Sequence, residues 1–202
     1  TEASRTFGAR EFRDTMDATV FDIMEHGGHG RVMRFDPETG SAEVILDNLA
    51  YANGIAISPA NDFLVIVEMN EYRILKYWLA GPKAGTTEVL LDNLPGFGDN
   101  LKTGHNGRFW LGFAAPRKAI VDKLSDKQWL RKVIMRLPKF IQPEADVSSH
   151  VIAFNGDGEI LMNMHDPAAR FPTLTGVLET RTNLYLTTLY GSALPVIAKQ
   201  NL

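Results

Sequence analysis

The chain has 202 residues, of which 45% are hydrophobic and 22% are charged, the balance of an ordinary globular domain. Its formal net charge of −3 argues against a nucleic-acid partner, because nucleic-acid-binding domains usually carry a basic face. It has no cysteine, which excludes a disulfide framework and thiolate chemistry.

The amino end shows neither a signal peptide nor a membrane-spanning run of apolar residues. Because the first residue is Thr1 rather than Met, we expect the sequence to be a piece of a longer protein. A signal or membrane anchor would then lie in the missing amino-terminal part, so the sequence leaves the compartment open. Residues 9–26 place Phe12, Met16 and Val20 at helical spacing, which predicts a first helical insertion.

A repeat organises the rest of the chain. Residues 31–49 read RVMRFDPETGSAEVILDNL and residues 73–94 read RILKYWLAGPKAGTTEVLLDNL, so that both end in Leu-Asp-Asn-Leu, 45 residues apart. A looser third copy spans 150–166, and a fourth begins in 193–202, where the chain stops. A period in the forties with several short strands per unit is typical of a β-propeller.

Strand-like runs rich in β-branched and aromatic residues lie between these hairpins, at 63–69, 108–114 and 183–191. Each unit is therefore expected to contain four antiparallel strands, which form one blade. We predict an all-β fold in which residues 1–202 form a partial propeller of about three and a half to four blades. Such an open ring would expose unpaired strand edges, which predicts self-association of the chain.

A second insertion is expected over residues 116–147. Within it, SDKQWLRKVIMRL (125–137) predicts an amphipathic helix with Ser125 as its N-cap. The apolar face would comprise Trp129, Leu130, Val133, Ile134 and Leu137, and the basic face Lys127, Arg131, Lys132 and Arg136. This helix could close one end of the ring, act as a lid over a pocket, or rest on a membrane surface as a peripheral contact.

Three polar side chains precede inner hairpins at matching positions of the repeat. Asn53 opens one blade, and Asp99 and Asn100 open the next, with 46 residues from Asn53 to Asp99. In a propeller, such positions converge on the central axis. Carboxylate and amide oxygens that converge in this way suit Ca²⁺, although another divalent cation would also fit. The alternative is that Asn53-Gly54 and Asp99-Asn100 only form turns.

A resemblance to a known family covers nearly the whole chain and is carried by the stretch ANGIAISPANDFLVIVEMNEYRILKYWLAGPKAGTTEVLLDNLPGFGDN. The chain resembles the strictosidine synthase-like family. That family belongs to the six-bladed propeller superfamily of gluconolactonase, regucalcin and the paraoxonases. The resemblance implies that about two amino-terminal blades are missing. It also implies that Asn53 and Asp99, with Asn100 as in the paraoxonases, are metal ligands.

The family's namesake condenses an amine with an aldehyde by means of a glutamate that opens the last inner hairpin, with a histidine two positions before it. The matching positions here are Thr175 and Thr173, and neither carries protons at neutral pH as Glu or His does. This disfavours the condensing lyase. Thr175 remains a candidate for the substrate pocket, as does Glu68, for which an ion pair with Arg73 is the alternative. Glu179 is expected in the hairpin turn that follows.

The leading hypothesis is a calcium-dependent hydrolase of the lactonase or arylesterase type that acts on a small ester or lactone. Its general base is not identifiable from the sequence. The alternative is a non-catalytic propeller with a structural metal that binds a membrane or a partner through residues 125–137.

Overall fold

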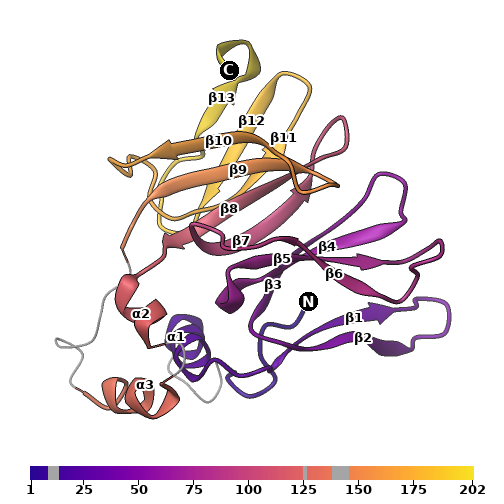
Figure 1. Ribbon diagram of the computed structural model, residues 1–202. Coiled ribbons are helices and arrows are strands. Elements are labelled where there is room, and N and C mark those ends of the chain that lie inside the picture. The colour runs from indigo at the N-terminus through magenta and orange to yellow at the C-terminus, as the bar shows by residue number, and fades with distance from the viewer. Residues whose placement is uncertain (9–13, 125–126, 138–145) are drawn as a thin grey trace. The chain divides into compact units, whose positions relative to one another are not determined.

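The computed structural model describes residues 1–8, 14–124, 127–137 and 146–202, mostly as antiparallel strands (Figure 1). The chain divides into two compact units, residues 1–52 with 117–145 and residues 53–116 with 146–202. Among the described residues, no helix is both long and apolar enough to cross a membrane.

In its described part, the first unit combines one β-hairpin with three short helices. Its elements are α1 (Thr15–Glu25), β1 (Gly30–Phe35), β2 (Ala42–Leu49), α2 (Ala119–Lys123) and α3 (Gln128–Ile134). β1 and β2 pair antiparallel, and Glu2 forms an isolated bridge with Arg31 beside them. The helices lie within the ranges 9–26 and 116–147 that the sequence analysis assigned to insertions, while residues 9–13, with Phe12, lie outside the described part.

The first helix is bounded by two local signals. The Asp14 carboxylate caps its start by accepting a hydrogen bond from the Asp17 N–H at 2.8 Å. The helix ends at His26, whose left-handed backbone (φ 57°) lets its N–H donate to the Asp22 carbonyl.

The α3 helix presents different faces from those predicted. Ser125 lies outside the described residues, and α3 itself begins at Gln128. Arg131, assigned to the basic face, is only 1% exposed, whereas Trp129, assigned to the apolar face, is 69% exposed. A helix that closed the ring with its apolar face would bury Trp129 and expose Arg131, and the structure shows the reverse for these two residues.

The cause is the set of backbone acceptors that surround Arg131. Its guanidinium donates to the carbonyls of Leu124 at 2.6 Å, Val121 at 3.3 Å and Ile23 at 3.3 Å. These carbonyls belong to the last turns of α2 and α1, where helix geometry leaves acceptors unsatisfied and favours a cation. Burying Arg131 turns the opposite side of α3, with Trp129, towards solvent.

The second unit contains three sheets of sequential strands. The first sheet has the order β3 (Ala52–Ile57), β4 (Phe63–Glu68), β5 (Arg73–Trp78) and β6 (Thr87–Leu91). The second has the order β7 (Gly96–Thr103), β8 (Arg108–Pro116), β9 (Ser149–Asn155) and β10 (Ile160–Asp166). The third comprises β11 (Leu174–Glu179), β12 (Asn183–Thr188) and β13 (Val196–Ala198). Short 3₁₀ turns span Met69–Glu71 and Lys199–Asn201.

Two complete four-stranded antiparallel sheets and a third of three strands confirm the predicted blades. The repeated Leu-Asp-Asn-Leu motif now has a structural reason. Asn48 (φ 60°) and Asn93 (φ 53°) both adopt the left-handed conformation, and each N–H donates to the preceding aspartate side chain at 2.8 Å. Asparagine tolerates this conformation better than most residues, so it suits the bend that ends each outer strand.

The sheets of the second unit pack through apolar faces. The second and third sheets share one apolar cluster. It comprises Trp110, Val151 and Ala153 of the second sheet and Leu174, Val177, Leu184 and Leu186 of the third. Between the first and second sheets, Phe63 packs on Phe109 with ring centroids 6.0 Å apart. This packing holds the inner strands β3, β7 and β11 in fixed positions.

Candidate functional site

The inner strands β3, β7 and β11 lie side by side, with the first residues of β3 and β11 beside the middle of β7. Asn53 is the second residue of β3, and Asp99 and Asn100 lie within β7, so these residues belong to their strands rather than preceding them as predicted. A Cβ atom on Gly54 would lie 2.3 Å from the Asp99 carbonyl oxygen and 2.4 Å from the Leu101 nitrogen, so the two backbones pass too closely for a larger residue. On the other side of β7, a Cβ on Gly176 would lie 3.3 Å from the Asn100 Cβ. Residues at matching repeat positions therefore do converge, as the repeat predicted.

Asn53 and Asp99 meet through their side chains. The Asn53 amide donates a hydrogen bond to the Asp99 carboxylate, and it also lies 3.5 Å from the Met69 sulfur. Burial raises the pKa of Asp99 to about 6. The hydrogen bond from Asn53 lowers this pKa, but by less than burial raises it. No basic side chain among the described residues compensates this carboxylate.

A β-bulge sets the directions of Asp99 and Asn100. Gly98 pairs with Phe113 and Leu101 with Leu111, so β7 has one residue more than β8 across this interval. As a result, the consecutive residues Asp99 and Asn100 do not follow a regular alternation. Asp99 contacts Asn53 of β3 and is partly buried, whereas Asn100 adjoins Gly176 of β11 and is exposed.

The two threonines that replace the proton-carrying pair of the namesake are buried at the start of β11. The Thr175 hydroxyl donates a hydrogen bond to the Thr187 hydroxyl at 3.0 Å, because the Thr187 hydroxyl itself donates to the Gly176 carbonyl at 3.2 Å. Thr173 is 5% exposed and has a left-handed backbone (φ 57°). Gly176, the neighbour of Thr175, is the residue of β11 that adjoins Asn100.

Glu68 ends β4, whose last residues lie beside the first residues of β3. It is 3% exposed and forms an ion pair with Arg73, with 2.6 Å between Oε2 and Nε. The ion pair that was the alternative to a pocket role is therefore present. Two residues later, Asn70 is 4% exposed, and neither atom of its amide has a hydrogen-bond partner in the described part of the chain. Sequence reasoning missed Asn70, because an Asn in a turn gives no sign of being buried.

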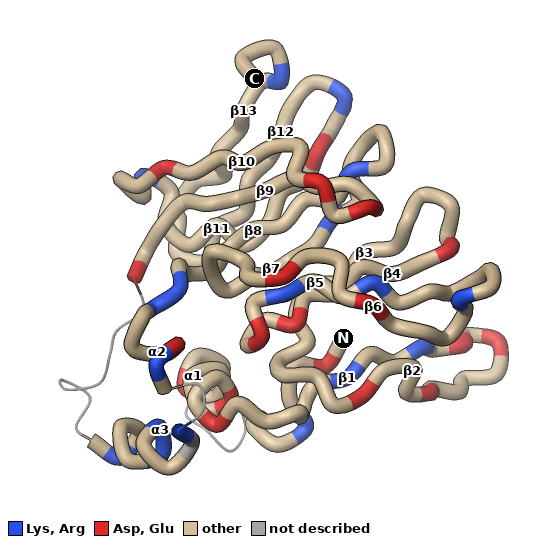
Figure 2. The backbone as a smooth tube through the Cα atoms, in the orientation of Figure 1, with Lys and Arg blue, Asp and Glu red and all other residues tan. Residues whose placement is uncertain are grey.

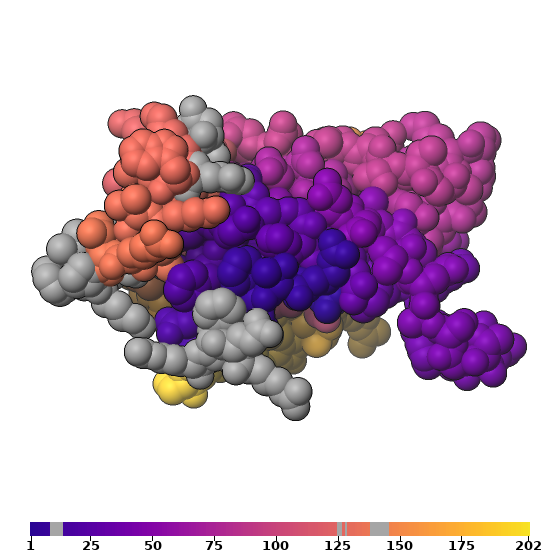
Figure 3. Space-filling view, turned by 90° about the horizontal axis from the view of Figure 1, so that it is seen from below, coloured from indigo at the N-terminus to yellow at the C-terminus, as the bar shows by residue number. Residues whose placement is uncertain are grey.

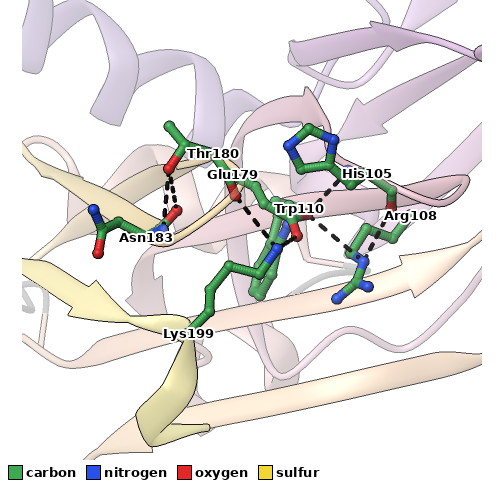
Figure 4. A network of polar contacts seen from close by, with 7 residues as sticks. All are labelled: His105, Arg108, Trp110, Glu179, Thr180, Asn183 and Lys199. Atoms are coloured by element: carbon green, nitrogen blue, oxygen red, sulfur yellow. Dashed lines mark hydrogen bonds and ion pairs between the residues drawn. The ribbon is translucent and has the colours of Figure 1, made fainter.

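Glu179 lies at the centre of a polar network in the second unit (Figure 4). It is the last residue of β11 rather than part of the following turn, so that expectation was wrong. Its carboxylate accepts hydrogen bonds from the Trp110 indole at 2.8 Å, the His105 N–H at 3.1 Å and the Lys199 ammonium at 2.5 Å. Burial alone would raise its pKa, but the hydrogen bonds from Lys199, Trp110 and His105 lower it below the usual range.

Glu179 stands at the opposite end of β11 from Thr175, and its charge is fully engaged. We therefore interpret it as a brace between the β7–β8 turn and β13. Over the described residues, no three or more His, Asp or Glu side chains come together in a way that could hold a metal ion. The candidate site consequently depends on one carboxylate, Asp99, together with amide groups.

Comparisons with known proteins agree with this fold. The model of the strictosidine synthase family matches residues 1–82. An adipocyte plasma membrane-associated protein from Bos taurus is 33% identical over 171 residues, which cover 81% of this chain and 42% of that protein. Protein strictosidine synthase-like 13 from Arabidopsis thaliana is 34% identical over 151 residues, which cover 72% of this chain and 37% of that protein. The chain thus spans less than half the length of these relatives.

Solved structures show the same architecture at low sequence identity. The calcium-binding protein regucalcin from Agrobacterium tumefaciens aligns with a TM-score of 0.55 and 14% identity, over 83% of this chain and 47% of that one. A gluconolactonase from Xanthomonas campestris aligns with a TM-score of 0.53 and 17% identity, over 80% of this chain and 42% of that one. These likenesses establish a β-propeller architecture. The family-model match and the relatives above, which are 33% and 34% identical over 81% and 72% of this chain, show that the chain belongs to the strictosidine synthase-like family.

Proposed function

We propose that this chain carries part of the active site of a calcium-dependent hydrolase of the lactonase or arylesterase type, acting on a small ester or lactone. The observation that carries the proposal is the contact between Asn53 and Asp99 on two adjoining inner strands. The propeller likeness to a gluconolactonase and to a calcium-binding protein supports the same class.

The residues present are compatible with a hard cation. Asp99 is a partly buried carboxylate without a basic partner in the described chain, so its charge is unfavourable unless a proton or a cation neutralises it. Asn70 adds a buried amide whose polar atoms lack hydrogen bonds there. Carboxylate and amide oxygens are ligands that Ca²⁺ prefers over the softer groups that other metals take.

Asp99 and Asn53 would hold the ion, with Asn100 as a further oxygen donor. When bound, Ca²⁺ would supply Lewis-acid polarisation of the ester carbonyl. The hydroxyl of Thr175 would line the substrate side, where it orients a substrate oxygen without exchanging a proton at neutral pH. Because Ca²⁺ takes six to eight oxygens, these residues provide only part of the coordination sphere. Water, substrate or protein beyond these residues would complete it.

This assignment leaves Glu68 outside the chemistry. Its carboxylate is buried and bound to Arg73, so it supports the turn that carries Asn70 rather than touching substrate. The threonines at 173 and 175 likewise argue against amine–aldehyde condensation, because no acid–base residue occupies either position.

The test measures hydrolysis of phenyl acetate and of small lactones in the presence of Ca²⁺ or of a chelator. We expect turnover that the chelator abolishes and that Asp99→Asn and Asn53→Ala both remove. The matched control is Asp157→Asn, an exposed aspartate in the β9–β10 turn, which should retain activity. Melting temperature measured with and without Ca²⁺ gives a second readout. A chain that neither hydrolyses these substrates nor gains stability from Ca²⁺ would rule the proposal out.

A further inference from the structure

The exposed face of α3 mixes apolar and basic side chains. Trp129 is 69% exposed and Val133 is 44% exposed, and Lys132 and Arg136 are exposed on the same side. Figure 3 shows α3 in orange at the surface of the molecule. A tryptophan is costly to leave in water, since it is among the side chains with the largest apolar area. This face therefore needs an explanation that the core of the first unit does not supply.

The hydrogen bonds of Arg131 fix the orientation of α3. Arg131 holds three carbonyls of α1 and α2, so α3 cannot turn Trp129 inward without withdrawing a buried guanidinium from its acceptors. The fold stabilises the arrangement in which the aromatic residue faces outward.

Charge is concentrated around the same helix. Residues 117–137 contain seven Lys or Arg and two Asp, a net charge of +5 in a chain whose total is −3. Figure 2 shows basic positions on α2 and α3. Arg131 is buried and Arg117 pairs with Asp122, which leaves Lys123, Lys127, Lys132 and Arg136 as the exposed cations of this segment. A group of exposed cations is complementary to an anionic partner.

An apolar cleft of about 230 Å³ lies next to these basic residues, within the first unit. Its walls include Phe7, Phe21, Met24 and Met135, and Lys132 and Arg136 also line it. Glu25 is the one carboxylate among its lining residues, and it is bonded to His29 at 2.8 Å. An apolar cavity bordered by cations suits a molecule that has an acyl chain and an anionic headgroup.

From these observations we infer that the exposed face of α3 and the adjoining cleft dock on a membrane surface that contains anionic lipids. Lys132 and Arg136 bind the lipid headgroups, and Trp129 and Val133 enter the interfacial layer, where tryptophan is favoured because its ring is amphipathic. An acidic protein would match the charge, but it would leave the apolar cleft unexplained. The inference does not depend on the hydrolase proposal, because none of its residues belongs to the candidate metal site.

The test is co-sedimentation of the chain with phosphatidylcholine vesicles, with and without phosphatidylserine. We expect binding only when phosphatidylserine is present, weakened by salt, and accompanied by a blue shift of tryptophan emission. Lys132→Glu with Arg136→Glu should weaken binding about tenfold or more. The matched control is Lys102→Glu with Arg181→Glu, which alters net charge equally at exposed positions of the second unit and should leave binding within about twofold.

Trp129→Ala should weaken binding, while Trp129→Phe should retain binding and lose the blue shift. Circular dichroism melts would verify that each variant is folded. Equal loss in the two charge-reversed double variants would overturn the inference, as would equal binding to vesicles without phosphatidylserine. Binding to polyglutamate as tight as binding to vesicles, without a shift in emission, would assign the face to an acidic protein and also overturn it.

Discussion

Asn53 donates a hydrogen bond to Asp99, and through this contact the second residue of β3 is linked to the bulge of β7. The pair joins two blades through their inner strands. Because the carboxylate is partly buried and its partner is neutral, its pKa is raised to about 6. This single shift leads to opposite predictions for the metal-free and the metal-bound protein.

Without metal, Asp99→Asn should stabilise the chain at pH 7.5. The folded state binds the proton of Asp99 more tightly than the unfolded state, whose pKa is near 3.8, so this group's contribution to stability is present below that value. It is lost as the pH rises through about 6. Asparagine carries no charge to desolvate and avoids that loss. Thermal melts of both proteins between pH 4 and pH 8 measure the effect, and parallel pH profiles would contradict it.

With Ca²⁺, Asp99→Asn should instead make the chain less stable than the wild type. The wild-type chain should gain melting temperature from Ca²⁺ at pH 7.5, and the gain should shrink below pH 6 because protons compete for the Asp99 carboxylate. Asp99→Asn should show no gain at either pH. Asp157→Asn, at an exposed position, should behave like the wild type. A calcium effect that is independent of pH would show that another group binds the ion.

The convergence of these residues was predictable because repeat position fixes place in a propeller. The strands were predictable for a related reason: alternating apolar residues and the Leu-Asp-Asn-Leu bend are local signals that each blade repeats. The role of Glu179 was not predictable in this way. Glu179 accepts a hydrogen bond from the N–H of His105, which lies 74 residues upstream, and no local pattern specifies that contact.

The burial of Arg131 in α3 was not predictable for the same reason. A helical wheel assumes that arginine prefers solvent, but the acceptors of Arg131 include a carbonyl 108 residues away. Only the three-dimensional arrangement of two helix ends makes burial of the guanidinium favourable. Likewise, nothing in the sequence around Asn70 distinguishes a buried amide from an ordinary turn residue.

The close approach of β3 and β7 depends on Gly54. Gly54→Ala would place a methyl group 2.3 Å from a backbone oxygen of Asp99, so one strand must move. Overpacking of this kind costs about 1–3 kcal/mol in the free energy of unfolding. Urea denaturation would measure it, with Gly8→Ala as the control, because a Cβ at Gly8 meets nothing within 4 Å. An unchanged stability of the Gly54→Ala variant would mean that the strands are further apart than described.

Glu179→Ala should destabilise the chain by about 3–5 kcal/mol, since it leaves the cations and the indole around a buried carboxylate without their acceptor. The loss should be greatest near neutral pH. The lowered pKa of Glu179 means that its contribution is present above its ordinary pKa and disappears as the pH falls through the lowered one. Glu88→Ala removes a more exposed carboxylate that pairs with Lys83, and should destabilise the chain far less. Similar losses for both variants would refute the interpretation of Glu179 as a brace.

Arg131→Met tests what holds the helices of the first unit together. Methionine retains much of the apolar volume but leaves the carbonyls of Leu124, Val121 and Ile23 without their donor, which should cost about 2–4 kcal/mol. Amide hydrogen exchange should then accelerate in α1 and α3 while the strands of the second unit keep their protection. Lys132→Met, on the exposed side of the same helix, should change stability by no more than about 0.5 kcal/mol. If the Arg131 variant exchanged at wild-type rates in both helices, its guanidinium would not be the contact that keeps Trp129 facing outward.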